Sequence, residues 1–207
     1  MFKQALASNG LIAILRGVRP EEVVGIGEVL YAEGFRVIEV PLNSPEPYRS
    51  IRALRDSLPA DCVIGAGTVL SAEQVQQVKA AGGQLIVMPH SDPAVLQAAK
   101  AAGLWLAPGV ATPTEAFAAL AAGADVLKLF PAEMIGTAVV KALLAVLPTG
   151  TALVPVGGIS PDNMQAFVAA GVKGFGLGSG LYRPGLSAAE VATRAAAYVA
   201  AWRRLSA

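Results

Sequence analysis

A lysine and a glutamate each interrupt an apolar, strand-like run in this chain. Lys128 lies in the run 126–130, whereas the other five lysines fall in helical patterns, in a turn or near the terminus. Loss of hydration in such a run lowers the pKa of an ammonium group and leaves a neutral amine that can attack a carbonyl carbon. Glu39 interrupts the run 37–40 in the same way. The two residues predict Schiff-base chemistry with a proton-shuttling carboxylate, and a structural ion pair is the alternative.

The elements that must position this pair alternate along the whole chain. The predicted strands are 11–15, 36–40, 62–66, 85–88, 105–107, 126–130, 152–156 and 174–177. The predicted helices are 20–33, 45–57, 72–81, 93–102, 113–122, 137–147, 161–170 and 188–205. Eight β-α units about 25 residues apart, with near-continuous apolar strands, favour an α/β fold, a (β/α)8 TIM barrel with one domain over 1–207. A doubly wound open sheet is the alternative, but no G-x-G-x-x-G motif opens the first helix.

Capping residues mark the ends of these helices. A serine, threonine or aspartate before a helix can accept a hydrogen bond from its first turn, and glycine commonly follows the last turn. The predicted N-caps are Ser71, Asp92, Thr112 and Ser160, and the glycines at helix ends are Gly34, Gly82, Gly103, Gly123 and Gly171.

Polar residues follow several strands on what a barrel would make its catalytic rim. Arg16 follows the first strand, where its guanidinium suits a carboxylate or phosphate, and Thr68 follows the third, where its hydroxyl suits a substrate. A surface charge and a turn residue are the alternatives. His90 is expected to be a rim or capping residue, and Asp125 a structural one. Glu133 starts a helix, where a carboxylate is favourable, and could also orient the loop before it.

Two glycine-containing loops follow the last two strands. Gly157 and Gly158 follow the seventh strand, and Gly178 and Ser179 follow the eighth. Glycine lets backbone N–H groups approach an anion closely, and the loops after strands seven and eight are the recurrent phosphate site of this barrel. The loops therefore favour phosphate binding over simple tight turns.

Composition excludes several classes of function. The net charge is +1 and no basic stripe occurs, so we expect no nucleic-acid partner. Apolar residues make up 54% of the chain, but the apolar runs are too short for a membrane helix, so we expect no membrane. The one cysteine, Cys62, fits a buried position in a reducing cytoplasm. Only 15% of residues are charged, which favours self-association.

Five motifs, in this order, resemble those of the 2-keto-3-deoxy-6-phosphogluconate/galactonate aldolases. The motifs read IAILRG, IEVPL, GAGTV, LKLFPA and VGGI, and the match runs from about residue 12 to residue 182. The resemblance implies a class I aldolase without metal or organic cofactor, built as a homotrimer of (β/α)8 barrels. Its substrate would be a phosphorylated 2-keto-3-deoxy sugar acid.

The resemblance also implies roles for individual residues. Lys128 falls on the Schiff-base lysine and Glu39 on the general acid/base. Arg16 and Thr68 fall on substrate-binding positions at the carboxylate end. The positions of the phosphate cradle are Gly157, Gly158, Gly178 and Ser179.

Two features resemble the galactonate branch of this family. Asn43 and Ser44 stand where gluconate enzymes usually carry an arginine-containing run, and Val156 stands where they usually carry threonine. The expected substrate is therefore 2-dehydro-3-deoxy-6-phosphogalactonate, with the gluconate epimer as the alternative. Two other classes are a metal-dependent epimerase, which a single histidine disfavours, and a sugar-phosphate-binding barrel without catalysis, in which we would expect Lys128 or Glu39 to be replaced.

Overall fold

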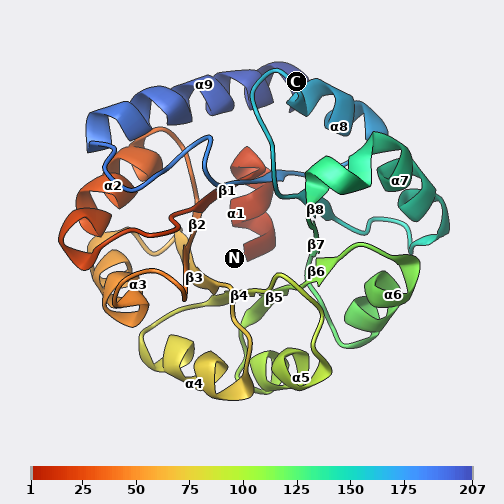
Figure 1. The fold of residues 1–207 in the computed structure, drawn as a ribbon, viewed down its shortest axis with the longest axis horizontal. Helices are drawn as coiled ribbons and strands as arrows, with labels where there is room; N and C mark the ends of the chain where they lie inside the picture. The colour runs from red at the N-terminus through yellow and green to blue at the C-terminus, as the bar shows by residue number, and fades with distance from the viewer. Residues whose placement is uncertain (1, 207) are drawn as a thin grey trace.

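A computed structural model describes residues 2–206, in which short strands alternate with helices (Figure 1). The strands are β1 (Leu11–Ile14), β2 (Val37–Pro41), β3 (Val63–Gly67), β4 (Leu85–Val87), β5 (Trp105–Ala107), β6 (Gly109–Val110), β7 (Leu127–Leu129), β8 (Leu153–Pro155) and β9 (Phe175–Leu177). The helices are α1 (Phe2–Asn9), α2 (Pro20–Ala32), α3 (Pro47–Ser57), α4 (Ala72–Ala80), α5 (Pro93–Ala101), α6 (Pro113–Ala121), α7 (Ala132–Val146), α8 (Met164–Ala170) and α9 (Ala188–Ser206). All eight predicted strands and all eight predicted helices are therefore found.

The strands pair in parallel and form two sheets. One sheet has the order β5-β4-β3-β2-β1-β9, and the other has the order β6-β7-β8. An isolated parallel bridge links Val156, after β8, to Gly176 in β9. At the other junction, β5 and β6 are separated along the chain by Pro108 alone. The helices α2 to α9 surround the strands as a ring (Figure 1), so the fold is α/β and TIM-barrel-like.

Side-chain alternation along the strands produces two apolar cores. Successive residues of a strand point to opposite faces, so Val37 and Glu39 share one face while Ile38 and Val40 share the other. Ile38 and Val40 belong to the core between strands and helices. Val37 belongs to a second core inside the ring of strands. Glu39 therefore faces this interior, and so does Lys128, because Val126 belongs to the same inner core.

Helix capping follows the predicted pattern at three of four sites. The side chains of Ser71, Asp92 and Thr112 accept hydrogen bonds from the first turns of α4, α5 and α6. The prediction for Ser160 was wrong, because α8 begins at Met164 and its N-cap is Asn163. The Oδ1 atom of Asn163 accepts a hydrogen bond from the backbone N–H of Ser160 at 3.0 Å. The side chain of Asn163 therefore orders the loop before α8, where Ser160 was expected to cap the helix.

One helix was not predicted from the sequence. Helix α1 lies across one end of the ring of strands (Figure 1), with Phe2 and Leu6 buried in the inner core. The ring of Phe2 lies 5.9 Å from that of Trp105. A helix of eight residues is marginal by itself, so its stability depends on burying these side chains.

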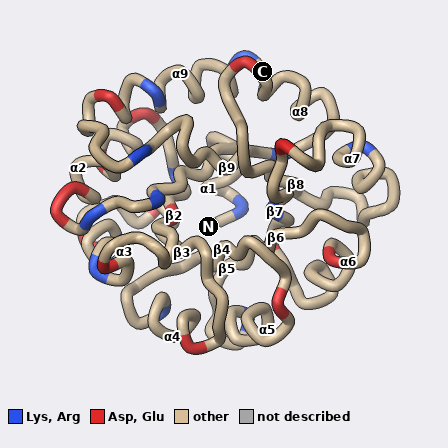
Figure 2. The backbone as a smooth tube through the Cα atoms, viewed as in Figure 1, with Lys and Arg blue, Asp and Glu red and all other residues tan. Residues whose placement is uncertain are grey.

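Charged residues lie mainly on the outer helices and loops, while most of the inner ring is free of them (Figure 2). In the described part of the chain, no helix combines the length and hydrophobicity that a membrane span requires. Glu39 and Lys128, which are buried in the interior, are therefore exceptions to the general pattern, and they indicate the position of a functional site.

Candidate active site

Lys128 lies in the middle of β7 with its side chain inside the ring. The residue is only 6% exposed, and its Nζ atom lies 4.7 Å from the centroid of the Phe130 ring. Burial lowers the pKa of the Lys128 ammonium, the nearby carboxylate of Glu39 opposes this shift, and the positive charge of Arg16 adds to it. The environment therefore favours the neutral amine more than water does.

Glu39 lies in β2, 1% exposed, and faces the same interior. Its Oε2 atom is buried and has no hydrogen-bond partner. Burial raises the pKa of this carboxyl group to about 7, although Lys128 and Arg16 both act to lower it. A carboxyl group that titrates near neutrality can both donate and accept a proton at physiological pH.

Gly67, at the end of β3, makes room for this carboxyl group. A Cβ atom on Gly67 would lie 2.6 Å from Oε1 of Glu39 and would overlap Oε2. Any side chain at position 67 would therefore force the carboxyl group of Glu39 to move.

The alternative of a structural ion pair does not describe Lys128 and Glu39. Among the ion pairs of residues 2–206, none joins these two side chains. Their interaction is electrostatic across the interior, since each shifts the pKa of the other. A structural pair would satisfy the carboxylate with direct hydrogen bonds, whereas Oε2 of Glu39 has none.

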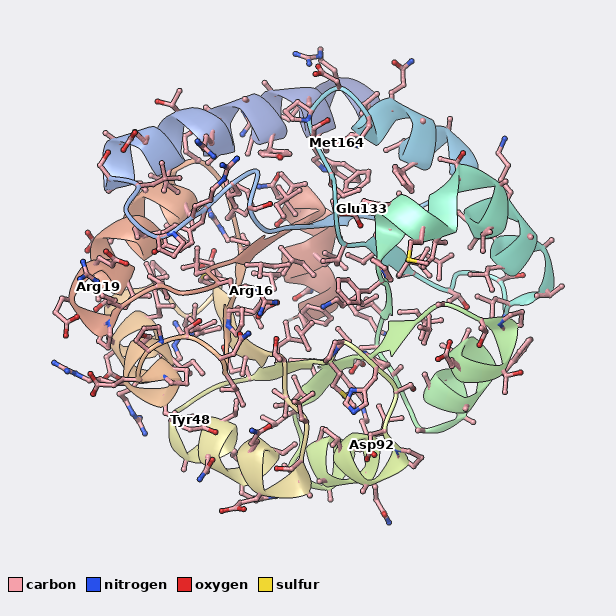
Figure 3. All side chains as sticks on the ribbon, viewed as in Figure 1. Arg16, Arg19, Tyr48, Asp92, Glu133 and Met164 are labelled. Atoms are coloured by element: carbon pink, nitrogen blue, oxygen red, sulfur yellow. The ribbon has the colours of Figure 1, made fainter. Side chains whose placement is uncertain are left out.

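Arg16 connects the loops that follow three neighbouring strands. Its Nη1 atom donates a hydrogen bond to Oδ1 of Asn43 at 2.7 Å, and Nη2 donates to Oγ1 of Thr68 at 3.5 Å. In the same loops, the N–H of Gly17 donates to Oγ of Ser44 at 2.9 Å. Figure 3 shows Arg16 near the centre of the ring. The structure thus brings Arg16 and Thr68 together, and it joins Asn43 and Ser44 to them.

A pocket of about 730 Å³ opens on this side of the ring. Its lining includes most of the predicted rim residues, namely Arg16, Thr68, Val156, Gly157, Gly158, Gly178 and Ser179. Lys128 and Glu39 are not among the lining residues. Phe130, which the ammonium of Lys128 contacts, does line the pocket, and so does Ile14, which pairs with Glu39. The two charged residues therefore lie within the strands, next to the pocket rather than on its surface.

The loop of Gly157 and Gly158 has a backbone that only glycine adopts easily. The φ angles are +113° and +62°, in the left-handed region. The side chain of Asn163 donates a hydrogen bond to the carbonyl oxygen of Gly158 at 2.8 Å, which holds the loop in place. Glu133, from the first turn of α7, packs directly on these glycines.

Two further pocket residues were missed in the sequence. Arg183 lines the pocket, and its Nε atom donates a hydrogen bond to the carbonyl oxygen of Ser179 at 2.9 Å. Tyr182 also lines it, with its hydroxyl donating to Oε1 of Glu22 at 2.9 Å. The available signal was their position directly after the Gly178–Gly180 loop, because residues that follow a strand end stay near the rim.

The structure does not bring every conspicuous residue into the site. His90 is exposed and does not line the pocket. Asp125 is structural, as predicted, because its Oδ2 atom accepts a hydrogen bond from the N–H of Leu106 and pairs with Lys100 at 3.5 Å. The single cysteine, Cys62, is buried, as predicted. Residues 2–206 contain no group of three or more His, Cys, Asp or Glu side chains arranged to hold a metal ion.

Several known proteins with similar sequences and structures are aldolases. The family model described as KDPG and KHG aldolase matches residues 2–193. A probable 2-dehydro-3-deoxy-6-phosphogalactonate aldolase from Rhizobium meliloti is 50% identical, covering 93% of this chain and 91% of the relative. The 2-dehydro-3-deoxy-6-phosphogalactonate aldolase of Escherichia coli is 48% identical, covering 93% and 94%. A solved structure described as native KDPGal superposes with a TM-score of 0.93 at 46% identity, covering 95% of each chain.

Proposed function

The chain belongs to the KDPG and KHG aldolase family, and we propose that it is a class I aldolase. In this proposal it cleaves 2-dehydro-3-deoxy-6-phosphogalactonate to pyruvate and glyceraldehyde 3-phosphate. The observation that carries the proposal is the burial of Lys128 and Glu39 on one interior face beside the pocket. A lysine with a lowered pKa and a carboxyl group with a pKa of about 7 are the two groups that imine chemistry requires.

The proposed reaction begins when the neutral amine of Lys128 attacks the C2 keto carbon. Glu39 transfers protons to and from the carbinolamine, which loses water to give a protonated imine. The C3–C4 bond then breaks, with its electron pair flowing into the iminium, while Glu39 accepts the C4 hydroxyl proton through a water molecule. Glyceraldehyde 3-phosphate leaves, and the enamine is protonated at C3. Water hydrolyses the resulting imine to pyruvate and free Lys128. The residues therefore supply only proton transfer and iminium formation, and the reaction needs no cofactor.

The two ends of the substrate would be held by different parts of the pocket. We assign the carboxylate to Arg16, whose guanidinium is already oriented by Asn43 and Thr68. We assign the phosphate to the backbone of Gly157, Gly158, Gly178 and Ser179. Arg183 adds a positive charge beside Ser179, which favours a phosphate at this end.

Reductive trapping tests the chemistry. Borohydride added with pyruvate should attach a three-carbon adduct to the wild-type protein, detected by intact-mass measurement and mapped to Lys128. The Lys128→Ala variant should gain no adduct and no aldolase activity, whereas Lys173→Ala, which removes an exposed lysine, should behave as wild type. A wild-type protein that is not modified would contradict the proposal and favour a sugar-phosphate-binding barrel without catalysis.

The choice of epimer rests on Val156, on Asn43 and Ser44, and on the similarity to two proteins named as 2-dehydro-3-deoxy-6-phosphogalactonate aldolases. Val156 lines the pocket and offers no hydroxyl to the substrate C4 oxygen. We therefore expect a higher kcat/KM for the galactonate epimer than for the gluconate epimer. Val156→Thr should shift this ratio toward gluconate by about tenfold, the effect of about 1.4 kcal/mol of differential transition-state binding. A wild-type preference for gluconate would refute the substrate while leaving the aldolase proposal intact.

We also propose how the chain is organised. The two sheets would act as one closed (β/α)8 barrel, because the Val156–Gly176 bridge and the β5–β6 continuity join both pairs of edges. One domain, residues 1–207, would carry the whole activity. Exposed apolar side chains on the neighbouring helices α6 and α7, among them Phe117 and Met134, support self-association. The family resemblance implies a homotrimer, which sedimentation analysis would test. A cytoplasmic location fits the single buried thiol.

A further inference from the structure

Glu133 places a carboxylate in the part of the pocket assigned to a phosphate. It lines the same 730 Å³ pocket as Gly157, Gly158 and Ser179. A Cβ atom built on Gly157 would overlap Oε2 of Glu133 and lie 3.2 Å from Oε1, and one on Gly158 would lie 3.1 Å from Oε1. Figure 3 shows this side chain at the start of α7, on the inner edge of the ring. The carboxylate is thus in contact with the backbone that would bind the anion.

A phosphate cannot occupy this space while the carboxylate remains there. The absence of side chains on Gly157 and Gly158 is what leaves room for an anion, and Glu133 fills that room. The carboxylate of Glu133 and a phosphate bound beside it would also repel each other, and the repulsion is stronger for a doubly charged phosphate. A phosphate bound against the backbone of Gly157 and Gly158 would therefore have to displace the carboxylate.

The backbone of this turn is fixed, so the side chain is the part that must move. The N–H of Ala132 donates a hydrogen bond to the carbonyl oxygen of Val156 at 2.9 Å, and both Ala132 and Ile135 are buried. Glu133 is exposed, which lets its side chain rotate toward solvent without disturbing the core.

We propose that Glu133 sets the affinity and the selectivity of the site for phosphate, by occupying the glycine cradle in the free protein until a phosphate displaces it. The inference rests on the proposed function, because it takes the cradle as the phosphate end of the substrate site. A role of this kind gives the protein a means to reject weak anions, since a ligand must overcome both the occupancy and the charge of the carboxylate.

Titration with inorganic phosphate tests this role without any need for catalysis. Glu133→Gln removes the charge, and Glu133→Ala removes both the charge and the occupancy. We expect phosphate to bind about tenfold more tightly to the glutamine variant, the effect of one charge about 5 Å away at a water-exposed site. The alanine variant should bind at least as tightly. The gain should shrink as salt is added, because salt screens charges at exposed sites.

Asp162→Asn is the matched control. Asp162 is an exposed carboxylate in the loop that follows Gly158, and it does not line the pocket. Its removal should change phosphate affinity by less than about twofold, as expected for a screened surface charge. An equal gain in the control would overturn the inference in favour of a general effect of net charge. Unchanged or weaker phosphate binding in the two Glu133 variants would also overturn it.

Kinetics and trapping separate this inference from the proposed function. In the aldolase reaction, the Glu133 variants should lower KM for the phosphorylated substrate. If the wild-type protein traps no pyruvate but Glu133→Gln still tightens phosphate binding, the aldolase proposal fails and the role of Glu133 stands. If trapping succeeds and phosphate binding does not respond, the role of Glu133 fails alone.

Discussion

The two ends of the barrel-like interior are built from the same strands but with opposite chemistry. At the amino ends, Val37 and Val126 pack with Phe2 of α1 in a purely apolar core. Two residues further along the same strands, Glu39 and Lys128 place charged groups inside the ring. The difference shows how one fold separates stability from chemistry: one end is closed by a helix, and the other is left open to a pocket.

Glycine is what permits the charged end. Apolar side chains such as those of Val37 and Val63 fill the interior at the closed end. At the open end, Gly67 and Gly176 leave space for the carboxyl group of Glu39 and the side chain of Val156. Burying an unpaired carboxylate is unfavourable, which is why the pKa of Glu39 rises to about 7. The open end therefore gives up stability for reactivity, and the closed end can offset the loss.

Removing the carboxylate of the open end should have the largest effect. Glu39→Gln should lower kcat by about two to four orders of magnitude, the usual contribution of general acid–base catalysis. Slow trapping of pyruvate should persist, because Lys128 remains. Steady-state kinetics would measure this, with Glu28→Gln, an exposed glutamate on α2, as the control. Near-normal turnover would show that Glu39 has only a structural role.

Removing the side chain of Phe2 at the closed end should lower stability and leave activity unchanged. Phe2→Ala deletes a fully buried ring that packs against Trp105, and it should lower the free energy of unfolding by about 3–5 kcal/mol. Activity per folded molecule should stay unchanged at a temperature where both proteins are folded. Denaturant unfolding and initial rates would measure the two quantities. Leu70→Ala, at an exposed leucine in the loop before α4, is the control. A loss of activity in folded Phe2→Ala would contradict the separation of the two ends.

Filling the space beside the carboxyl group of Glu39 should lower the activity of the open end. A Cβ atom in Gly67→Ala would displace the carboxyl group of Glu39. We expect kcat to fall by about 100-fold, the typical effect of moving a catalytic group by about 1 Å. Kinetics on Gly67→Ala and on Gly25→Ala, where a Cβ atom meets nothing within 4 Å, would measure it. Equal rates in the two variants would mean that the position of Glu39 is not critical.

The pH dependence of stability should report the cost of the buried carboxylate. The folded-state pKa of Glu39 is about 7 and its ordinary value is 4.5, so the folded protein binds the proton more tightly than the unfolded chain. Its contribution to the free energy of unfolding should therefore fall as pH rises from about 4.5 to about 7, and then remain constant. Glu39→Gln lacks this contribution, so its stability relative to wild type should rise by about 1–3 kcal/mol between pH 5 and pH 8. Denaturant unfolding at both values would measure it; a constant difference would contradict the raised pKa.

The sequence predicted which strands carry the candidate catalytic residues better than it predicted the structure of the loops. Lys128 and Glu39 were identifiable because a charged residue in an apolar strand is a local signal. The N-cap predicted at Ser160 was wrong. The side chain of Asn163 accepts a hydrogen bond from the N–H of Ser160, and α8 begins only after Asn163. Arg183 was missed because its place beside the pocket depends on the path of the loop after β9, which the sequence does not show.

The sequence by itself determined the alternation of strands and helices, the positions of Glu39 and Lys128 within apolar strands, and the family to which the chain belongs. These properties depend on residue periodicity and on short motifs, which are local. Only the tertiary structure decided that α1 closes one end, that Gly67 accommodates the carboxyl group of Glu39, and that Glu133 rests on Gly157 and Gly158. Those contacts join segments far apart in the chain, and their geometry depends on how the strands curve around a shared interior. No local pattern records that geometry.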